Sequence, residues 1–226
     1  MVPGIIYAQA RSLPLQVEKV LLRINSTQAG KHRIVPAVIW LEPLAGAPAL
    51  PFSSAKHYTL LQKNRQFIPH LQVIPVGTAV SFPNADPFFH NVFSLFDGKR
   101  FDLGLYEAGS SKSVTFTREG VSYIFCDIHP EMSAVVLALA TPLYAVADAN
   151  DSFVLRDVPS GDYNLHLWVE GVPQNVVDSL TRLVHLTAQT VDLGMLDVPT
   201  MSGGMEHHRD KFGNTYDPHS KSPYGP

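Results

Sequence analysis

Alternation of apolar and polar residues with a period of two is the feature that most constrains the fold of this chain. It runs through residues 113–117 and again through residues 163–169, where the apolar set is Tyr163, Leu165, Leu167 and Val169. Such a period places the two sets on opposite faces of a strand, and no long segment has helical periodicity. The sequence therefore predicts an all-β protein, with His166 on the outer face of its strand and without a ligand role.

Composition sets the outer limits on domain count and partners. A chain of 226 residues with 45% hydrophobic content can hold one large or two small domains with real cores. The formal net charge of −3, with 16% charged residues, gives no basic stripe for nucleic acid. The longest apolar run, 134–147, is interrupted by Thr141 and Pro142 and is too short to cross a bilayer. We expect protein partners, no nucleic acid and no membrane span.

The first residues bear on where the protein works. A small-x-small pattern at Ala8 and Ala10 follows a short apolar run, as at a signal-peptidase site, although a charged leader segment is missing. We interpret residues 1–12 as the remnant of a signal peptide, the alternative being an apolar arm. The protein is therefore expected to be periplasmic or otherwise exported.

A possible metal site is set out by Cys126, His129 and Met132, which follow one another with two residues between each pair. A second histidine, His90, lies upstream in the segment 87–91. Two imidazoles and a thiolate in a plane with a weak axial thioether are the ligands of a blue-copper electron-transfer site. The short spacing suits a tight loop that leaves a strand, with His90 supplied by a neighbouring strand. The sequence thus predicts one copper ion, cycling between Cu+ and Cu2+.

Each of these residues also has an ordinary interpretation. A lone cysteine is most often a small buried hydrophobe, a lone histidine a satisfied polar group, and a methionine a filler of the core. Structural zinc is a further competitor, but it prefers several thiolates or imidazoles and does not favour a thioether. It is the combination of the four residues that favours copper.

The stretch 67–140 resembles the cupredoxin family, and the Cys-x2-His-x2-Met spacing is similar to that of the amicyanins. The likeness includes the glycine turn and strand of 76–84 and the strand, turn and strand of 113–125. It implies a Greek-key β-sandwich with His90, Cys126, His129 and Met132 as ligands. It also implies that Asn91, directly after the first histidine, ties the two ligand-bearing loops together near the thiolate, as residues around a metal site often do.

Residues 148–165 resemble a different fold, the small transthyretin-like sandwiches related to the carboxypeptidase regulatory domain. An acidic turn precedes a strand with Phe153, a Val-Pro-x-Gly turn follows at Pro159 and Gly161, and Tyr163 opens the next strand. Proline fixes φ and glycine allows a tight reversal. The resemblance implies a second, smaller β-sandwich and says nothing about function.

The domain boundaries follow from a missing pair of strands before Asp148. Segments near Val20 and Ile39 are strand-like, so we expect a discontinuous sandwich of residues 15–45 and 141–200 with a copper domain of residues 50–140 inserted in it. The alternative is that residues 15–45 add strands to the copper domain. Residues 201–226 read as a flexible tail or a surface-hugging arm. Its residues Met205, His207, His208 and His219 leave open a role in copper capture.

Enzyme signatures are absent from the sequence, which has no phosphate loop, nucleophile elbow or helical zinc-protease motif. We expect a carrier of single electrons between redox proteins, not an enzyme. The alternatives are a module for copper storage, delivery or sensing, and an interaction protein in which the copper site is secondary.

The cupredoxin resemblance also implies that the edge of His129 reaches the surface. One member of the pair Phe88 and Phe89 is expected to be exposed beside it. His70 is expected to be structural, the alternative being a place near the metal end of its strand.

Overall fold

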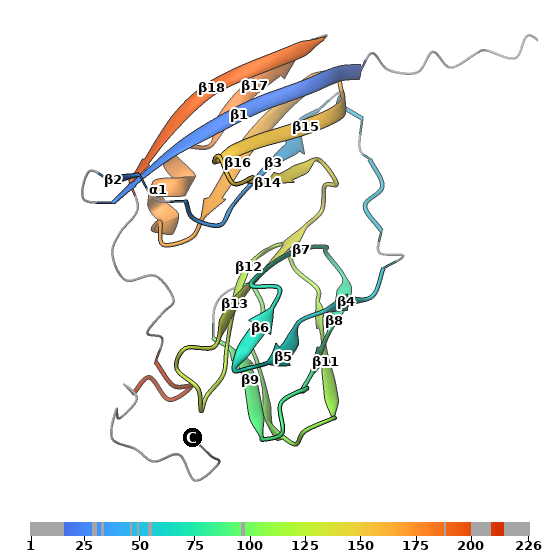
Figure 1. Cartoon of the computed structure of the whole chain (residues 1–226). Helices are drawn as coiled ribbons and strands as arrows, with labels where there is room; N and C mark the ends of the chain where they lie inside the picture. Colours follow the sequence, from blue (N-terminus) through green and yellow to red (C-terminus); the bar gives the residue numbers. More distant parts are fainter. Residues whose placement is uncertain are drawn as a thin grey trace, which may run out of the picture.

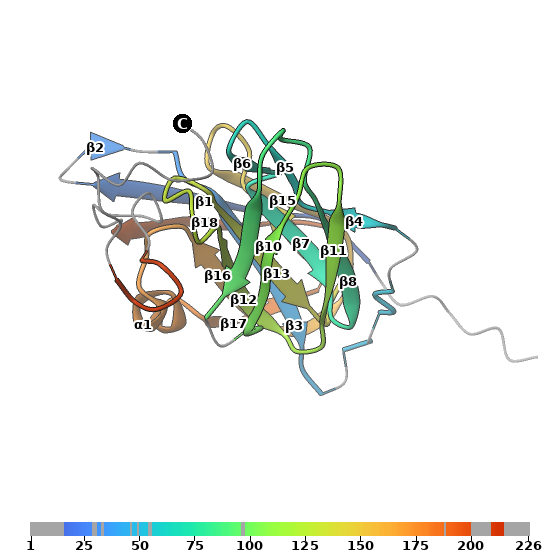
Figure 2. The same ribbon diagram turned by 90° about the horizontal axis from the view of Figure 1, so that it is seen from below.

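The computed structural model describes residues 16–28, 31–32, 34–45, 47–48, 50–53, 56–95, 98–187, 189–199 and 209–214. The expected signal-peptide remnant, residues 1–12, and most of the expected tail lie outside these ranges. Within them strands dominate, and the helix is the short α1 (Gln174–Ser179), so the all-β fold class is confirmed. No helix in these ranges is long and apolar enough to cross a membrane. Figure 1 shows two bodies of strands, one above the other, and Figure 2 views them from below, so that one body overlaps the other.

One body, here called the central sandwich, comes from the middle of the sequence. Its strands form a sheet in the order β10-β9-β12-β13-β7, a sheet in the order β11-β8-β4 and the hairpin β5-β6. Phe82, Phe116 and Ile124 fill its core. Its strands are β4 (Tyr58–Thr59), β5 (Leu61–Lys63), β6 (Gln66–Ile68), β7 (Leu71–Pro75), β8 (Thr78–Pro83), β9 (His90–Ser94), β10 (Phe101–Tyr106), β11 (Ser111–Phe116), β12 (Gly120–Phe125) and β13 (Ser133–Leu139).

The other body, the terminal sandwich, is built from both ends of the described chain. Its sheets run β15-β1-β18, with β2 on β1, and β14-β3-β16-β17. Its core includes Leu22, Ile39 and Phe153. Its strands are β1 (Gln16–Gln28), β2 (Lys31–His32), β3 (Ala37–Pro43), β14 (Tyr144–Val146), β15 (Ser152–Pro159), β16 (Gly161–Val169), β17 (Arg182–Leu186) and β18 (Thr190–Pro199).

The sheet register decides where the N-terminal strands belong. Val20 of β1 lies opposite Leu155 of β15, and Ile39 of β3 lies opposite Leu167 of β16. Neither strand joins a sheet of the central sandwich. The strand pairing is therefore the one expected from the sequence, whereas the likeness to transthyretin and the exact domain boundaries stay predictions.

Two residues at the turn between β15 and β16, Gly161 and Tyr163, have specific roles in packing. An added Cβ at Gly161 would lie 3.0 Å from the Cβ of Ala47, so a larger residue would have to displace that neighbour. Tyr163 is fully buried, and its hydroxyl donates a hydrogen bond to the carbonyl of Pro159 at 2.7 Å. The aromatic ring thus fills the core while its one polar atom is satisfied.

The two sandwiches meet face to face through the outer sides of β7, β13 and β12 and of β14, β3 and β16. Val38 and Trp168 of the terminal sandwich pack there against Val135, Leu137 and Leu139 of the central one. Trp168 is only 2% exposed, although it lies on the side of β16 that faces away from the core of its own sandwich. The outer face that alternation predicts is therefore covered by the second sandwich instead of by water.

Candidate metal centre

Three of the four expected ligands lie at strand ends, and His129 lies in the loop between β12 and β13. His90 opens β9, Cys126 directly follows β12, and Met132 directly precedes β13. Phe125 pairs with both Phe93 of β9 and Ser133 of β13, which brings these strand ends together.

Backbone hydrogen bonds close the loop that joins β12 to β13. The N–H of Met132 donates to the carbonyl of His129 at 3.0 Å, and the N–H of Cys126 donates to the carbonyl of Met132 at 3.3 Å. Met132 is fully buried and packs in the same core cluster as Cys126. The short spacing in the sequence thus produces a closed turn, in which the two sulfur-containing residues flank the histidine.

Distances between the side chains support a metal site. Sγ of Cys126 lies 3.7 Å from Nδ1 of His90 and 3.5 Å from Nδ1 of His129. A metal with bonds of about 2.3 Å to sulfur and about 2.0 Å to nitrogen separates those atoms by roughly 3.7 Å in a trigonal plane. These three residues form a group that could hold a metal ion, and they are buried. The residues present therefore fit the expected metal.

Burial keeps the ligands in distinct protonation states. It raises the pKa of the Cys126 thiol to about 11, although backbone N–H groups of Ile128, Asn91 and His129 donate to the sulfur and oppose the rise. Burial, and then the neighbouring His90, lower the pKa of His129 to about 4. Burial also lowers the pKa of His90, against the effect of Asp86. Both imidazoles are thus neutral at pH 7, the form that binds metals, and three N–H groups already point at the sulfur.

Asp86 sets the orientation of His90. The Nε2–H of His90 donates to Oδ2 of Asp86 at 2.8 Å, which leaves Nδ1 unprotonated and directed at Cys126. Burial alone would raise the pKa of Asp86, but the backbone N–H groups of Arg65 and Asn64 together with His90 lower it. Sequence reasoning missed Asp86, because a carboxylate in a turn resembles any other turn residue. Its position four residues before His90 was the available signal.

The turn that carries Asp86 is held by Asn84, which is 1% exposed. The amide nitrogen of Asn84 donates to the carbonyl of Phe88 at 2.8 Å, and its oxygen accepts the N–H of Asp86 at 3.0 Å. The same amide reaches the carbonyl of Tyr106 on β10 at 3.3 Å. One buried side chain therefore fixes the approach of the chain to His90.

Asn91 is buried at the site but makes contacts that the sequence did not specify. Its backbone N–H donates to the sulfur of Cys126, and its side-chain nitrogen donates to Oδ1 of Asp102 on β10 at 2.7 Å. The expected tie to the ligand loop therefore exists through the backbone, while the side chain braces β9 against β10. A role in tuning a bound metal stays a prediction.

The described part of the tail contacts this end of the molecule. The backbone N–H of Lys211 donates to Oδ1 of Asp127 at 2.9 Å, and its amino group lies 2.9 Å from Oδ2 of Asp102 and 3.6 Å from Oδ2 of Asp127. Lys211 thus links Asp127, which follows Cys126, to Asp102, which accepts the hydrogen bond from the Asn91 side chain. The expected metal-capturing residues of the tail, Met205, His207, His208 and His219, lie outside the described ranges.

Among the other histidines, His70 and His166 have clear partners. Nδ1 of His70 lies 3.1 Å from the carbonyl of Ser133, and Nε2 lies 2.9 Å from Oε1 of Glu170 in the terminal sandwich. His70 therefore links the end of the ligand loop to the second body, which is a structural role. His166 lies on the outer side of β16, paired with Glu42.

Aromatic rings cover the site. Phe88 packs on His90 and His129, with ring centroids 5.2 and 5.6 Å away, and the guanidinium of Arg65 lies 5.4 Å from its centroid. His129 keeps only 6% exposure and His90 none, so the imidazole edge reaches the surface less than expected. Phe89 is the exposed member of the pair, at 41%.

Comparisons with known proteins give a structural likeness only. No family model matches the chain, and no curated protein matches its sequence. The chain is similar to a novel purple cupredoxin from Nitrosopumilus maritimus, with 26% identity and a TM-score of 0.33 over 36% of this chain and 99% of that one. It is also similar to the amicyanin of Paracoccus versutus, with 21% identity and a TM-score of 0.34 over 38% and 85%.

A third similar structure is the copper-containing nitrite reductase NirK from Thermus scotoductus SA-01. It shares 28% identity with a TM-score of 0.36 and is matched over 43% of this chain but only 25% of its own. Because these TM-scores lie below 0.5, the likenesses decide nothing about the site. The case for a metal rests on the side chains themselves.

Proposed function

We propose that this chain is a type 1 (blue) copper protein that carries single electrons between redox partner proteins outside the cytoplasm. The observation that carries the proposal is the buried arrangement of the Cys126 sulfur with the Nδ1 atoms of His90 and His129, at 3.7 and 3.5 Å. Met132 is the proposed axial ligand, because it is fully buried at the end of the same loop. One copper ion would supply a one-electron couple between Cu+ and Cu2+.

The residues of the chain would keep that couple reversible. Three backbone N–H groups stabilise negative charge on the sulfur of Cys126, and two neutral imidazoles are directed at the same point. Dense packing around buried ligands limits their rearrangement when the charge of a metal changes. Four protein ligands also leave little room for a substrate, which favours a carrier over an enzyme.

Copper storage, delivery or sensing is the alternative from a different class. A delivery site needs ligands that a recipient protein can reach. Here His90, Cys126 and Met132 have no exposed surface and His129 has 6%. That burial supports the carrier, since electrons cross a thin layer of protein whereas a metal ion must pass through it.

A partner is expected to approach over Phe88. Pro87 and Phe89 are exposed next to it in the sequence, and Phe88 itself touches both histidine rings. An apolar surface of this kind suits a transient redox complex, because little charge has to be desolvated on contact. Export is inferred from residues 1–12.

A visible spectrum of the full-length protein with one equivalent of Cu(II) tests the proposal. We expect the intense band of charge transfer from thiolate to copper. Cys126→Ser should abolish it, and His129→Gln should weaken or shift it. His57→Gln is the matched control, because His57 is exposed and has no place in the site. A weak ligand-field spectrum in the wild type, or a Cys126→Ser variant that stays blue, would overturn the assignment.

A further inference from the structure

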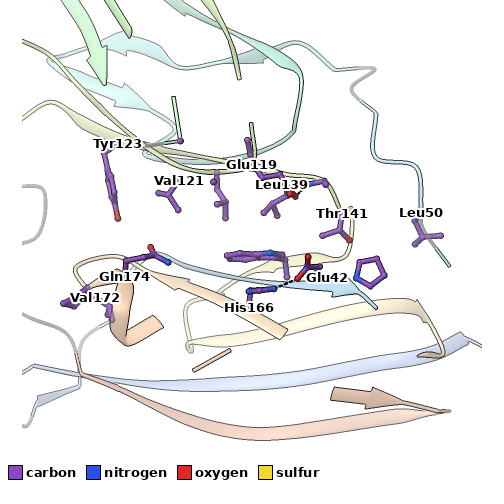
Figure 3. Close-up of a pocket in the computed structure, with 18 residues that line it drawn as sticks. Glu42, Leu50, Glu119, Val121, Tyr123, Leu139, Thr141, His166, Val172 and Gln174 are labelled. Atoms are coloured by element: carbon purple, nitrogen blue, oxygen red, sulfur yellow. Dashed lines mark hydrogen bonds and ion pairs between the residues drawn. The ribbon is translucent and has the colours of Figure 1, made fainter. Parts of the chain in front are cut away.

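A cleft of about 970 Å³ lies between the two sandwiches (Figure 3). Val121, Tyr123 and Leu139 enter it from the central sandwich, and Glu42 and His166 face them from the terminal one. Its volume falls in the range of small-molecule sites. Val121 lies near the start of β12 and Leu139 ends β13, whereas Cys126 follows β12 and Met132 precedes β13. The cleft is thus at the opposite end of these strands from the proposed copper site.

Aromatic side chains from both bodies line the cleft. Trp40 and His166 are cross-strand neighbours on β3 and β16, and their rings stack with centroids 5.2 Å apart and planes 13° from parallel. Tyr123 lies across from them, and its hydroxyl accepts a hydrogen bond from Nε1 of Trp168 at 3.3 Å. The stack and the hydrogen bond orient these rings without any ligand.

The charge of the lining is acidic. It contains the carboxylates of Glu42 and Glu119 and, among the lining residues that the structure describes, no lysine or arginine. Glu42 lies 2.9 Å from Nε2 of His166, and this hydrogen bond lowers the pKa of its carboxyl against the opposing effect of burial. Oε1 of Glu119 accepts the backbone N–H of Ala140 at 2.7 Å. Both carboxylates therefore hold fixed places on the wall, with negative charge that no neighbouring lysine or arginine of the lining offsets.

We propose that this cleft binds a small organic cation, a protonated amine or a quaternary ammonium on an apolar body. Faces of tryptophan and tyrosine attract a cation through their quadrupole, and a nearby carboxylate adds to that attraction. The apolar walls formed by Val121 and Leu139 would take the uncharged part of the molecule. An anion is disfavoured by the same two carboxylates. This site is independent of copper, so its success or failure leaves the proposed electron-transfer function untouched.

Equilibrium dialysis of the full-length protein with choline tests the site, with 3,3-dimethylbutan-1-ol as the uncharged molecule of the same shape. We expect saturable binding of choline and at least fivefold weaker binding of the alcohol. Trp40 and Trp168 are the two tryptophans of the chain, and both lie in the interface between the sandwiches. Tryptophan fluorescence should therefore change with the same midpoint as the dialysis.

Variants locate the binding. Glu42→Gln should weaken choline about fivefold, the size expected for loss of one partly exposed charge contact, and leave the alcohol unchanged. Glu119→Gln should act in the same direction. Glu18→Gln is the control, because Glu18 is an exposed carboxylate on β1 that does not line the cleft. Equal binding of choline and the alcohol, binding that Glu42→Gln and Glu119→Gln both spare, or no saturable binding of choline would overturn the proposal.

Discussion

Oδ2 of Asp86 lies 2.8 Å from Nε2 of His90, and both side chains are buried. The carboxylate is itself held by the backbone N–H groups of Asn64 and Arg65, at 2.6 and 3.0 Å. The ring of His90 is thus held through Nε2, while Nδ1 stays available for a metal. Contacts of this kind commonly change metal affinity by about 10- to 100-fold.

Asp86→Ala should therefore weaken copper binding by about 10- to 100-fold, because the ring of His90 loses the acceptor that sets its tautomer and orientation. Competition with a chelator of known affinity measures the change. Asp86→Asn is the informative companion: its side-chain oxygen can still accept the Nε2–H, but its NH2 group then faces the N–H of Asn64, so it should recover only part of the loss. An Ala variant with wild-type affinity would show that Asp86 does not position the ligand.

Copper affinity should depend on pH through a single proton. The pKa of Cys126 is raised to about 11, while those of His129 and His90 are lowered, His129 to about 4. Between about pH 7 and pH 9 the free protein then carries a neutral thiol and neutral imidazoles, so binding releases one proton. The dissociation constant for Cu(I), measured anaerobically, should fall about tenfold for each unit by which the pH is raised. A slope of two or three protons would mean that the histidines are protonated in the free protein.

Met132→Leu distinguishes an axial ligand from a filler of the core. The substitution keeps an apolar side chain of similar volume, so the fold should survive with a cost below about 1.5 kcal/mol. If the thioether donates to copper, its removal should raise the reduction potential while the charge-transfer band remains. Protein-film voltammetry and a visible spectrum give both readouts. An unchanged potential would assign Met132 to packing alone.

Lys211→Met should lower the reduction potential. The amino group of Lys211 lies near Asp102 and Asp127, the residue after Cys126, and removing a positive charge beside the ligand loop would favour Cu2+ over Cu+. A shift on the order of tens of millivolts is expected for a partly screened charge, and it should shrink as salt is added. Lys19→Met, on β1 of the terminal sandwich, is the control. Equal potentials for both variants would show that the contacts of Lys211 have no electrostatic effect on the site.

Phe89→Glu should slow electron exchange with a redox partner and leave the visible spectrum unchanged, because Phe89 is 41% exposed while Phe88 covers the histidines. Val154→Glu places the same charge on the terminal sandwich, where Val154 is 38% exposed. Stopped-flow rates that fall equally in the two variants would point to a general effect of charge. Rates unaffected by Phe89→Glu would point to another route for the electron.

Much of the site was predictable because its residues are chemically rare and closely spaced. The grouping of His90, Cys126 and His129 follows from ligand softness and a short loop. Asp86 was not predictable, since its role depends on a turn shaped by Asn84. The alternation of strands correctly assigned His166 to an outer face, but it could not tell that a second sandwich would cover Trp168 on that same face. A period-two pattern separates the two faces of a strand, but it does not predict whether water or another part of the protein covers each face.

The pairing of β1 with β15 and of β3 with β16 has a consequence for the order of assembly. During synthesis β1 and β3 emerge about 130 residues before these partners, as the pairs Val20–Leu155 and Ile39–Leu167 show, because the whole central sandwich lies between them in the sequence. The edges of β1 and β3 stay unpaired until then, whereas all strand pairs of the central sandwich lie within residues 58–139, so this body can close as soon as that stretch is made. The central sandwich is therefore expected to form first. Because β3 precedes it and β14 follows it in the sequence, its closure should bring these two strands together. A nascent chain from which residue 140 has left the ribosome should already protect the central strands from proteases and leave the N-terminal strands open to cleavage.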